Sequence, residues 1–207
     1  MEQDIITGNY FDKYNSKNPI YKRLMNGFFT SLIELTTQVS SQETLKILEA
    51  GCGEGHLTSI LLNHFKTIDY TGFDIDSELI QEAQKQLPEA KFNVDSIYEL
   101  NRYDNHSFKL CLVSEVLEHL EQPIEAIKSL QTLSCDYYLF SVPREPIWRV
   151  LNMLRLKYLG KFGNTPGHLQ HWSKKSFIKT ISNEFKIIEI RSPFPWTMIL
   201  CEKANAE

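Results

Sequence analysis

Short apolar runs alternate with amphipathic stretches along most of this 207-residue chain. The apolar runs predict strands at Lys46–Ala50, Tyr70–Asp74, Lys91–Val94, Phe108–Ser114, Asp136–Val142, Lys186–Arg191 and Trp196–Cys201. The amphipathic stretches predict helices at His56–Phe65, at Ser77–Gln86, from about Pro123 to Leu133, and from a Ser173 cap through Phe185. The chain before the first strand, up to about Val39, also has a helical pattern, with Pro19 in the first turn.

This order of elements is typical of an α/β protein. Apolar strands that alternate with helices form a mostly parallel, doubly wound sheet with helices on both faces. Ligands of such sheets bind beyond the carboxyl ends of the strands, where the strand order reverses. The residues that follow the first, second and fourth strands are therefore expected to converge on one site.

A glycine-rich turn, EAGCGEG from Glu49 to Gly55, joins the first of these strands to the next helix. Its glycines permit positive φ and let a ligand approach the backbone closely, and the helix start beyond them offers free N–H groups to an anion. A dinucleotide fingerprint, G-x-G-x-x-G, would require glycine where His56 stands. The spacing therefore favours a cofactor that presents a carboxylate over one that presents a pyrophosphate.

Acidic residues end the next two strands. Asp74 stands where a carboxylate can accept two hydrogen bonds from ribose hydroxyls, and Asp76 or Ser77 is better placed to cap the helix that follows. Asp95 comes after the third strand, where it can accept a hydrogen bond from an adenine amino group beside Ser96. Asp95 alone is weaker evidence, because aspartate is common in turns.

The fourth strand leads into the segment Ser114–Leu120, with the sequence SEVLEHL. Glu115 and His119 are four residues apart and would share one face of a helix, facing the cofactor or the substrate. His119 is a candidate general base because the pKa of imidazole lies near neutrality. A histidine that only satisfies backbone groups at the start of a helix is an equally good interpretation.

Together these residues resemble the class I S-adenosylmethionine (SAM) dependent methyltransferases of the type 11/12 small-molecule branch, which includes ubiquinone- and menaquinone-biosynthesis-type enzymes. The resemblance covers roughly Leu45 to Val142. It implies SAM as the cofactor, a seven-stranded Rossmann-like sheet with an antiparallel last strand, and methyl transfer to a small molecule, with O-methylation favoured. The cofactor-binding residues that it implies are Glu49, Gly51, Gly53, Gly55, Asp74, Ile75, Asp95, Ser96, Ser114 and Glu115.

The chain is expected to form a single domain. An N-terminal helical cap (1–44) precedes the SAM-binding core (45–142), and a lid insertion (143–172) precedes a closing helix and strands (173–207). Additions of this kind cover the cofactor and form the acceptor pocket in the family that the core resembles. The candidate acceptor-binding residues are Tyr10, Tyr14, Arg144, Arg149 and Trp172, and the candidate catalytic residues are His119, His168 and His171.

The two histidines of the lid follow a turn at Thr165–Gly167. A metal site would require further ligands, and none is evident near His168 or His171 in the sequence, so no metal is expected. A base or a substrate hydrogen-bonding role is more plausible than a metal site, and the alternative is that these histidines only fix the backbone of their own loop. The four cysteines form no C-x-x-C pair and are expected to be reduced thiols.

The charge of the chain suggests which partners it has. Lys and Arg number 22 and Asp and Glu number 26, so the net charge of −4 lacks the basic field of a nucleic-acid binder. The fourth strand is also not followed by the Asn-Pro-Pro-Tyr or Pro-Cys segments of DNA-methylating enzymes. A small-molecule acceptor is therefore expected, and no nucleic acid.

The lid departs from this average, with five Lys or Arg and one acid. This local charge suggests an anionic acceptor, which Arg144 or Arg149 would hold in a bidentate manner. Trp148, Leu151 and Leu154 beside basic residues leave open an interfacial helix that touches a membrane and reaches a lipid-linked acceptor. A lid helix packed on the domain is the simpler alternative.

The N-terminal sequence has neither an apolar signal core nor an Arg-rich presequence, so a cytoplasmic location is expected. The sequence does not fix the oligomeric state. Three other functions remain open: an NAD-dependent oxidoreductase, which shares the sheet, the glycine turn and the ribose acid; a non-catalytic SAM-binding partner; and a protein or RNA methyltransferase.

Overall fold

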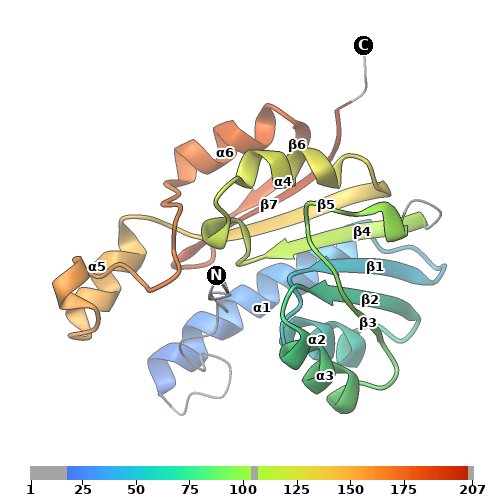
Figure 1. Cartoon of the computed structure of the whole chain (residues 1–207), viewed down its shortest axis with the longest axis horizontal. Coiled ribbons are helices and arrows are strands. Elements are labelled where there is room, and N and C mark those ends of the chain that lie inside the picture. Colours follow the sequence, from blue (N-terminus) through green and yellow to red (C-terminus); the bar gives the residue numbers. More distant parts are fainter. Residues whose placement is uncertain (1–17, 104–106, 205–207) are drawn as a thin grey trace, which may run out of the picture.

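The computed structural model describes residues 18–103 and 107–204, and its described strands form one seven-stranded sheet (Figure 1). The strand order is β3-β2-β1-β4-β5-β7-β6. The strands are β1 (Leu45–Ala50), β2 (Ile68–Asp74), β3 (Lys91–Val94), β4 (Ser107–Ser114), β5 (Ser134–Pro143), β6 (Phe185–Arg191) and β7 (Trp196–Lys203). Among the described strands, β7 runs antiparallel to both of its neighbours, β5 and β6, and all other neighbouring pairs are parallel. The predicted mostly parallel sheet with an antiparallel last strand is confirmed.

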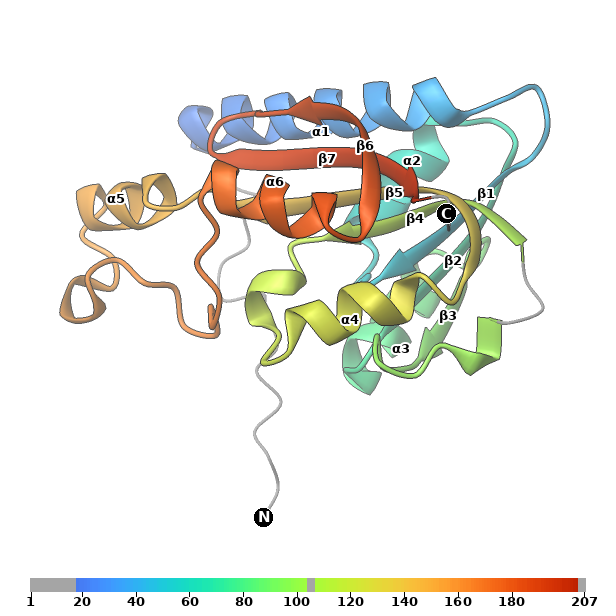
Figure 2. The same ribbon diagram turned by 90° about the horizontal axis from the view of Figure 1, so that it is seen from above.

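Helices cover both faces of the sheet (Figure 2). On one face lie α1 (Pro19–Val39), α2 (His56–His64) and α3 (Ser77–Gln86), and on the other lie α4 (Pro123–Leu130) and α6 (Lys174–Ser182). The remaining helix, α5 (Ile147–Leu154), stands beyond the carboxyl ends of the parallel strands. The described part of the chain also contains three short 3-10 helices: η1 (Asn101–Tyr103), η2 (Leu117–His119) and η3 (Leu159–Lys161).

Local sequence signals set the helix starts. Asn18 caps α1 and Pro19 occupies its first turn, Asp76 caps α3 by accepting from the amides of Glu78 and Leu79, and Ser173 caps α6. Each cap satisfies backbone N–H groups that have no partner inside the helix. The predicted first helix is confirmed, whereas the helix predicted to reach Leu133 ends at Leu130.

The core has two halves, one under each layer of helices. One face of α1 buries Phe28, Leu32 and Leu35 against the sheet, while Ala126 and Ile127 of α4 pack on the opposite face. Burial of each Leu or Phe side chain stabilises the fold by roughly 1.5–3 kcal/mol. Both faces of the central strands are therefore anchored, which fixes where their carboxyl ends lie.

The reversal of strand order falls at β1, which pairs with β2 on one side and with β4 on the other. The chain leaves the end of β5 and re-enters the fold before α6 at one point, because the Glu145 amide donates to the Trp172 carbonyl at 2.8 Å. Between these two points the lid is held together by internal hydrogen bonds, including one from Asn152 Nδ2 to the Gly163 carbonyl at 2.9 Å.

Among the described residues, no helix has both the length and the hydrophobicity that crossing a membrane requires.

Candidate functional site

The glycine turn after β1 has the backbone shape that its sequence predicts. Gly51 and Gly53 have φ of 74° and 53°, and both Gly51 and Cys52 donate their amides to the Phe73 carbonyl. A Cβ at position 51 would collide with Val116, whereas a Cβ at position 53 would meet no described residue within 4 Å. As far as the described residues show, the turn presents bare backbone and open space at Gly53, and α2 begins at His56, directly after its N-cap Gly55.

Asp74 ties the end of β2 to this turn. One carboxylate oxygen accepts from the Gly53 amide at 2.9 Å, and the other accepts from the Asp76 amide at 3.0 Å. Each oxygen keeps a second lone pair, so the carboxylate can still accept from two hydroxyls. Ile75, with 58% of its side chain exposed, lies next to it and offers an apolar surface. These residues fit the ribose of a nucleoside cofactor.

Asp95 lies one strand further along the same edge. Its amide donates to the Asp74 carbonyl at 3.1 Å, and its Oδ2 contacts the Tyr103 hydroxyl and the Arg102 guanidinium, both at 2.9 Å. The Asp95 carboxylate is thereby held in place, and Oδ1 is the oxygen left to accept from an adenine amino group. The neighbouring Ser96 hydroxyl accepts from the Tyr98 amide and shapes the turn.

Glu49 lies inside the core and not on the open side of the turn. Its side chain is 2% exposed and accepts from the Thr58 hydroxyl and the Tyr70 hydroxyl, both at 2.8 Å. Burial raises its pKa from 4.5 to about 7, against the two hydrogen bonds, and the charge of Asp74 adds to the rise. In this position Glu49 fastens α2 to β1 and β2 beneath the turn.

The segment after β4 does not form the predicted helix. Glu115 has a left-handed backbone with φ of 60°, and its amide still donates to the Ser141 carbonyl as the strand pairing ends. Because this conformation cannot continue into an α-helix, only the 3-10 helix η2 follows. The shared helical face predicted for Glu115 and His119 is therefore wrong. Ser114 is buried, its hydroxyl 2.8 Å from that of Ser141.

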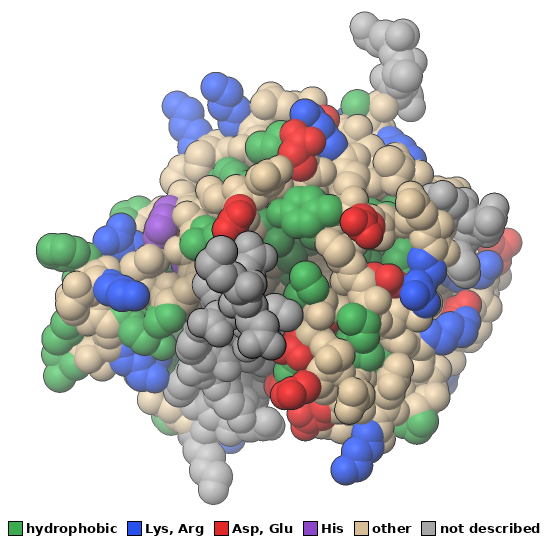
Figure 3. Space-filling view, in the orientation of Figure 1, with side chains coloured by type: hydrophobic (Ala, Val, Ile, Leu, Met, Phe, Trp, Pro, Cys, Tyr) green, Lys and Arg blue, Asp and Glu red, His purple; other side chains and the backbone are tan. Residues whose placement is uncertain are grey.

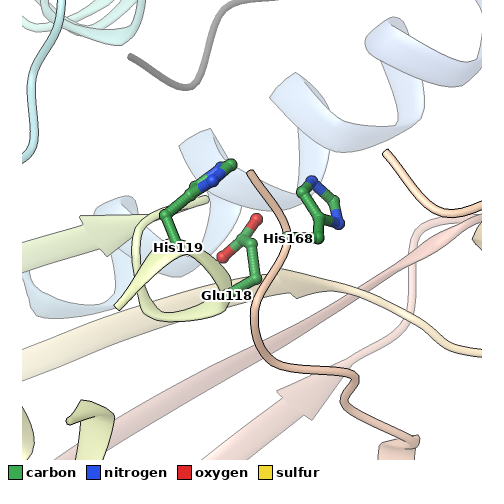
Figure 4. A group of neighbouring side chains, drawn as sticks. All are labelled: Glu118, His119 and His168. Carbon is green, nitrogen blue, oxygen red and sulfur yellow. The ribbon is translucent and has the colours of Figure 1, made fainter. Parts of the chain in front are cut away.

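The turn at η2 and the lid bring Glu118, His119 and His168 together (Figure 4). One ligand-type atom from each side chain lies within 4.8 Å of the others. The Glu118 carboxylate lies between the two imidazoles, and the rings of the histidines are 4.9 Å apart at 85°. Glu118 is 1% exposed and His168 is 9% exposed, so the cluster is largely shielded from solvent.

Main-chain contacts hold the lid against η2. The amides of Leu169 and Gln170 donate to the Glu118 carbonyl at 2.8 and 2.9 Å. His119 Nδ1 lies 3.0 Å from the Gly167 carbonyl. A carbonyl only accepts, so this nitrogen carries a proton and donates it.

The other predicted lid residues lie outside this cluster. His171 Nε2 contacts Asn164 at 2.8 Å, and burial and the Arg149 charge lower the pKa of its imidazole. Arg149 donates to the Phe162 carbonyl within the lid, and the Trp172 ring packs on Phe177. Arg144 follows directly on β5, at the same sheet edge as the turn. Tyr10 and Tyr14 lie outside the described residues.

Residues 48–136 match the family model of a methyltransferase domain. The match covers 89 of the 207 residues and identifies this core as a class I SAM-dependent methyltransferase domain. The cofactor of this family is SAM, and the turn at Gly51–Gly55, together with Asp74, fits it.

Two curated methyltransferases match parts of the core. The trans-aconitate 2-methyltransferase of Variovorax paradoxus (strain S110) is 31% identical over 39% of this chain and 31% of its own length. The malonyl-[acyl-carrier protein] O-methyltransferase of Priestia megaterium (strain DSM 319 / IMG 1521) is 36% identical over 30% of this chain and 22% of its own length. The chain thus spans about a third or less of the length of these relatives.

One solved methyltransferase covers the fold almost completely. It is the magnesium protoporphyrin IX methyltransferase of Synechocystis PCC 6803 with bound SAH, which matches 96% of each chain with a TM-score of 0.67 at 18% identity. At this identity the likeness concerns the fold alone. It extends beyond the core that the family model matches, to nearly the whole chain.

A separate cavity of about 550 Å³ lies at the amino ends of the strands, with Lys46, Asp69 and Ser107 in its wall. It is on the opposite edge of the sheet from the glycine turn, and ligands of such sheets bind at the carboxyl edge. We therefore assign it no part in the methyltransferase site.

Proposed function

We propose that this protein transfers the methyl group of SAM to an oxygen of a small anionic acceptor. The observation that carries the proposal is the joining of the Gly53 amide to Asp74 beside open space, which suits the ribose and amino-acid parts of SAM. SAM, when bound, supplies a methyl group on a sulfonium that is ready for in-line displacement. The chain itself positions the two reactants and excludes water, a contribution that can reach roughly 7–11 kcal/mol.

Arg144 supports an acceptor with a carboxylate. The side chain is partly buried at the carboxyl end of β5, and its Nε is a buried atom that has no hydrogen-bond partner among the described residues. A guanidinium pairs with a carboxylate through two parallel hydrogen bonds, and a buried donor without a partner costs free energy until one arrives. The names of the two curated relatives, which refer to trans-aconitate and a malonyl group, are consistent with this acceptor class.

The chemical class of the acceptor decides whether methyl transfer needs one of the histidines as a general base. A carboxylate is already anionic at neutral pH and needs no base before it attacks the methyl group. A hydroxyl acceptor would have to lose a proton, and then His119 or His168 would be the base that the sequence suggests. His171, which contacts Asn164 within the lid, is the least suited of the three.

The cofactor assignment is tested by calorimetric titration with S-adenosylhomocysteine, with NAD as a parallel control. Gly53→Val fills the open space, and Asp74→Asn removes the charge that faces the ribose, so both variants should weaken binding at least tenfold. Gly160→Ala, where an added Cβ also meets nothing within 4 Å, is the matched control and should bind like the wild type. Binding of NAD instead, or wild-type affinity in both variants, would overturn the assignment.

The acceptor class is tested with radiolabelled SAM against small di- and tricarboxylic acids, with alcohols, a protein mixture and small RNAs as the other arms. Arg144→Gln should raise KM for the carboxylic acid by roughly 10-fold or more, the loss expected for a charged hydrogen bond worth about 1.5–3 kcal/mol, and leave S-adenosylhomocysteine binding unchanged. Methylation of RNA or protein alone would refute the small-molecule acceptor.

The surface of the lid favours a second candidate, a lipid-linked acceptor reached from a membrane. Leu154, Leu156 and Phe162 are about three-quarters exposed, and Leu156 and Phe162 have left-handed backbones, with φ of 55° and 49°. Basic side chains lie among them: Arg155, Lys157 and Lys161. Figure 3 shows this mixture of hydrophobic and basic side chains at the lid end of the molecule. Such a surface suits an anionic bilayer interface.

Vesicle sedimentation tests this second candidate. The protein should bind vesicles that contain phosphatidylglycerol and not those of phosphatidylcholine alone, and binding should weaken as salt rises. Leu156→Ser with Phe162→Ser should abolish it, while Ile188→Ser, at an exposed apolar position of β6, should not. Binding that ignores both lipid charge and the lid substitutions would exclude a lid-mediated contact.

A further inference from the structure

The cluster of Glu118, His119 and His168 has the composition of a metal site. Three ligand-type atoms lie within 4.8 Å of one another. Tetrahedral coordination with bonds of about 2.1 Å requires a separation of about 3.4 Å between ligand atoms. Each atom would therefore move inward by less than about 1 Å, which small side-chain rotations provide. The carboxylate between two imidazoles is the donor set of many zinc enzymes.

The hydrogen bonding of His119, on η2, suits a metal ligand. His119 donates from Nδ1 to the Gly167 carbonyl at 3.0 Å, so in the neutral ring Nε2 is the nitrogen whose lone pair can coordinate a metal. A backbone carbonyl on the far nitrogen is the usual outer partner of a metal-binding histidine, because it fixes the tautomer and the ring orientation. The His168 ring is stacked on Trp148, with centroids 6.4 Å apart at 20°, so its orientation is also restricted.

The three residues come from two separate parts of the chain. Glu118 and His119 belong to the turn after β4, and His168 belongs to the lid. The Leu169 and Gln170 amides donate hydrogen bonds to the Glu118 carbonyl. These bonds fix the position of the lid backbone relative to the turn, next to the three side chains of the cluster. The Glu118 carboxylate is only 1% exposed, so the cluster lies under the lid and not on the open surface.

We propose that Glu118, His119 and His168 bind a divalent transition-metal ion of the zinc and cobalt class, which fastens the lid to the core. Two imidazoles favour these ions over magnesium and calcium, which prefer oxygen ligands. Three protein ligands leave a coordination position for water or for an oxygen of the acceptor. The proposal goes beyond methyl transfer and does not depend on it. It departs from the expectation from the sequence, because the ligands nearest to His168 in space lie about fifty positions earlier in the chain.

Titration of the chelator-treated full-length protein, freed of any affinity tag, with Co²⁺ tests the proposal through the visible absorption of the bound ion. We expect saturation at one ion per chain and competition by Zn²⁺. Affinity should fall at acid pH, because protonated imidazoles do not bind metal. His168→Ala and Glu118→Gln should each weaken binding by roughly 100-fold or more, at least the cost of removing an outer partner.

His171→Gln is the matched control, since it removes a lid imidazole that contacts Asn164 and not the cluster. A second readout is amide hydrogen exchange, which Zn²⁺ should slow at Leu169 and Gln170 in the wild type. Titration with S-adenosylhomocysteine is expected to give wild-type affinity in every variant and separates this question from the cofactor assignment. No saturable binding to the wild type, or binding that survives both cluster substitutions, would overturn the proposal and leave a hydrogen-bonded Glu–His cluster in its place.

Discussion

The buried carboxyl of Glu49 gives a prediction about stability that the structure makes quantitative. Burial holds its pKa at about 7 in the folded protein, against an ordinary value of 4.5. Each pKa unit corresponds to about 1.4 kcal/mol, so the ionised carboxylate is disfavoured in the folded state by about 3 kcal/mol. Because the folded protein binds this proton more tightly, the stabilisation is complete below about pH 4.5 and is lost as the pH rises through 7.

Replacing Glu49 by Gln should remove this dependence. The amide keeps an acceptor oxygen for Thr58 and Tyr70 and has no charge to bury. We expect the free energy of unfolding of the wild type to fall by roughly 2.5 kcal/mol between about pH 5 and pH 8.5 as a result of this group alone. In Glu49→Gln that contribution should disappear, so the variant gains on the wild type as the pH rises.

Urea unfolding at a series of pH values measures the difference. Other titrating groups are common to both proteins and cancel when the two curves are subtracted. Glu125→Gln is the control, because Glu125 is exposed and forms only a surface pair with Lys128 at 3.3 Å, worth less than about 1 kcal/mol. Parallel curves for the wild type and Glu49→Gln would refute the assignment of a raised pKa to this carboxyl.

Three further substitutions follow from the geometry. Gly27→Ala, at an exposed α1 position with no neighbour within 4 Å of the added carbon, should stabilise the protein by about 0.5–1 kcal/mol in thermal unfolding; a lower Tm would contradict the open environment. Asp76→Ala removes the cap of α3 and should cost about 1 kcal/mol, with a neutral result in the same assay counting against the cap. Gly163→Ala would drive a carbon into the Arg149 carbonyl at φ of 75°. It should loosen the lid, which limited trypsin digestion would report, without changing S-adenosylhomocysteine affinity; intact resistance of the lid to trypsin would argue against this contact.

The elements and the glycine turn were predictable because their signals are local. Pro19 with its neighbour Asn18, the cap at Asp76 and the positive φ at Gly51 and Gly53 depend on a few adjacent residues. The same logic failed after β4. Nothing in the sequence there distinguishes an α-helix from the short η2, since the deciding feature is the left-handed backbone of Glu115, held by the Ser141 carbonyl.

The positions of Glu49 and Glu118 could not be predicted from the sequence, for two different reasons. Glu49 lies on a central strand with both faces covered, so all but one residue of β1 are buried, and alternation no longer tells which face a side chain joins. The role of Glu118 depends on its proximity to His168, which lies about fifty residues later in the chain. Contact over such a distance depends on the path of the lid, which the sequence does not encode in any short spacing.

The two ends of the lid meet through the Glu145 amide and the Trp172 carbonyl, and its inner edge docks through the Leu169 and Gln170 amides. These contacts use main-chain atoms, which every residue except proline at the donor positions supplies. Most side chains of the lid can therefore change without moving the points where it joins the core, and lids of other lengths would close at little extra cost because loop-closure entropy grows only slowly with length. We therefore propose that the lid is an exchangeable cassette, and we expect that a different segment between 145 and 172 would change the acceptor while the strands of the core stay as they are.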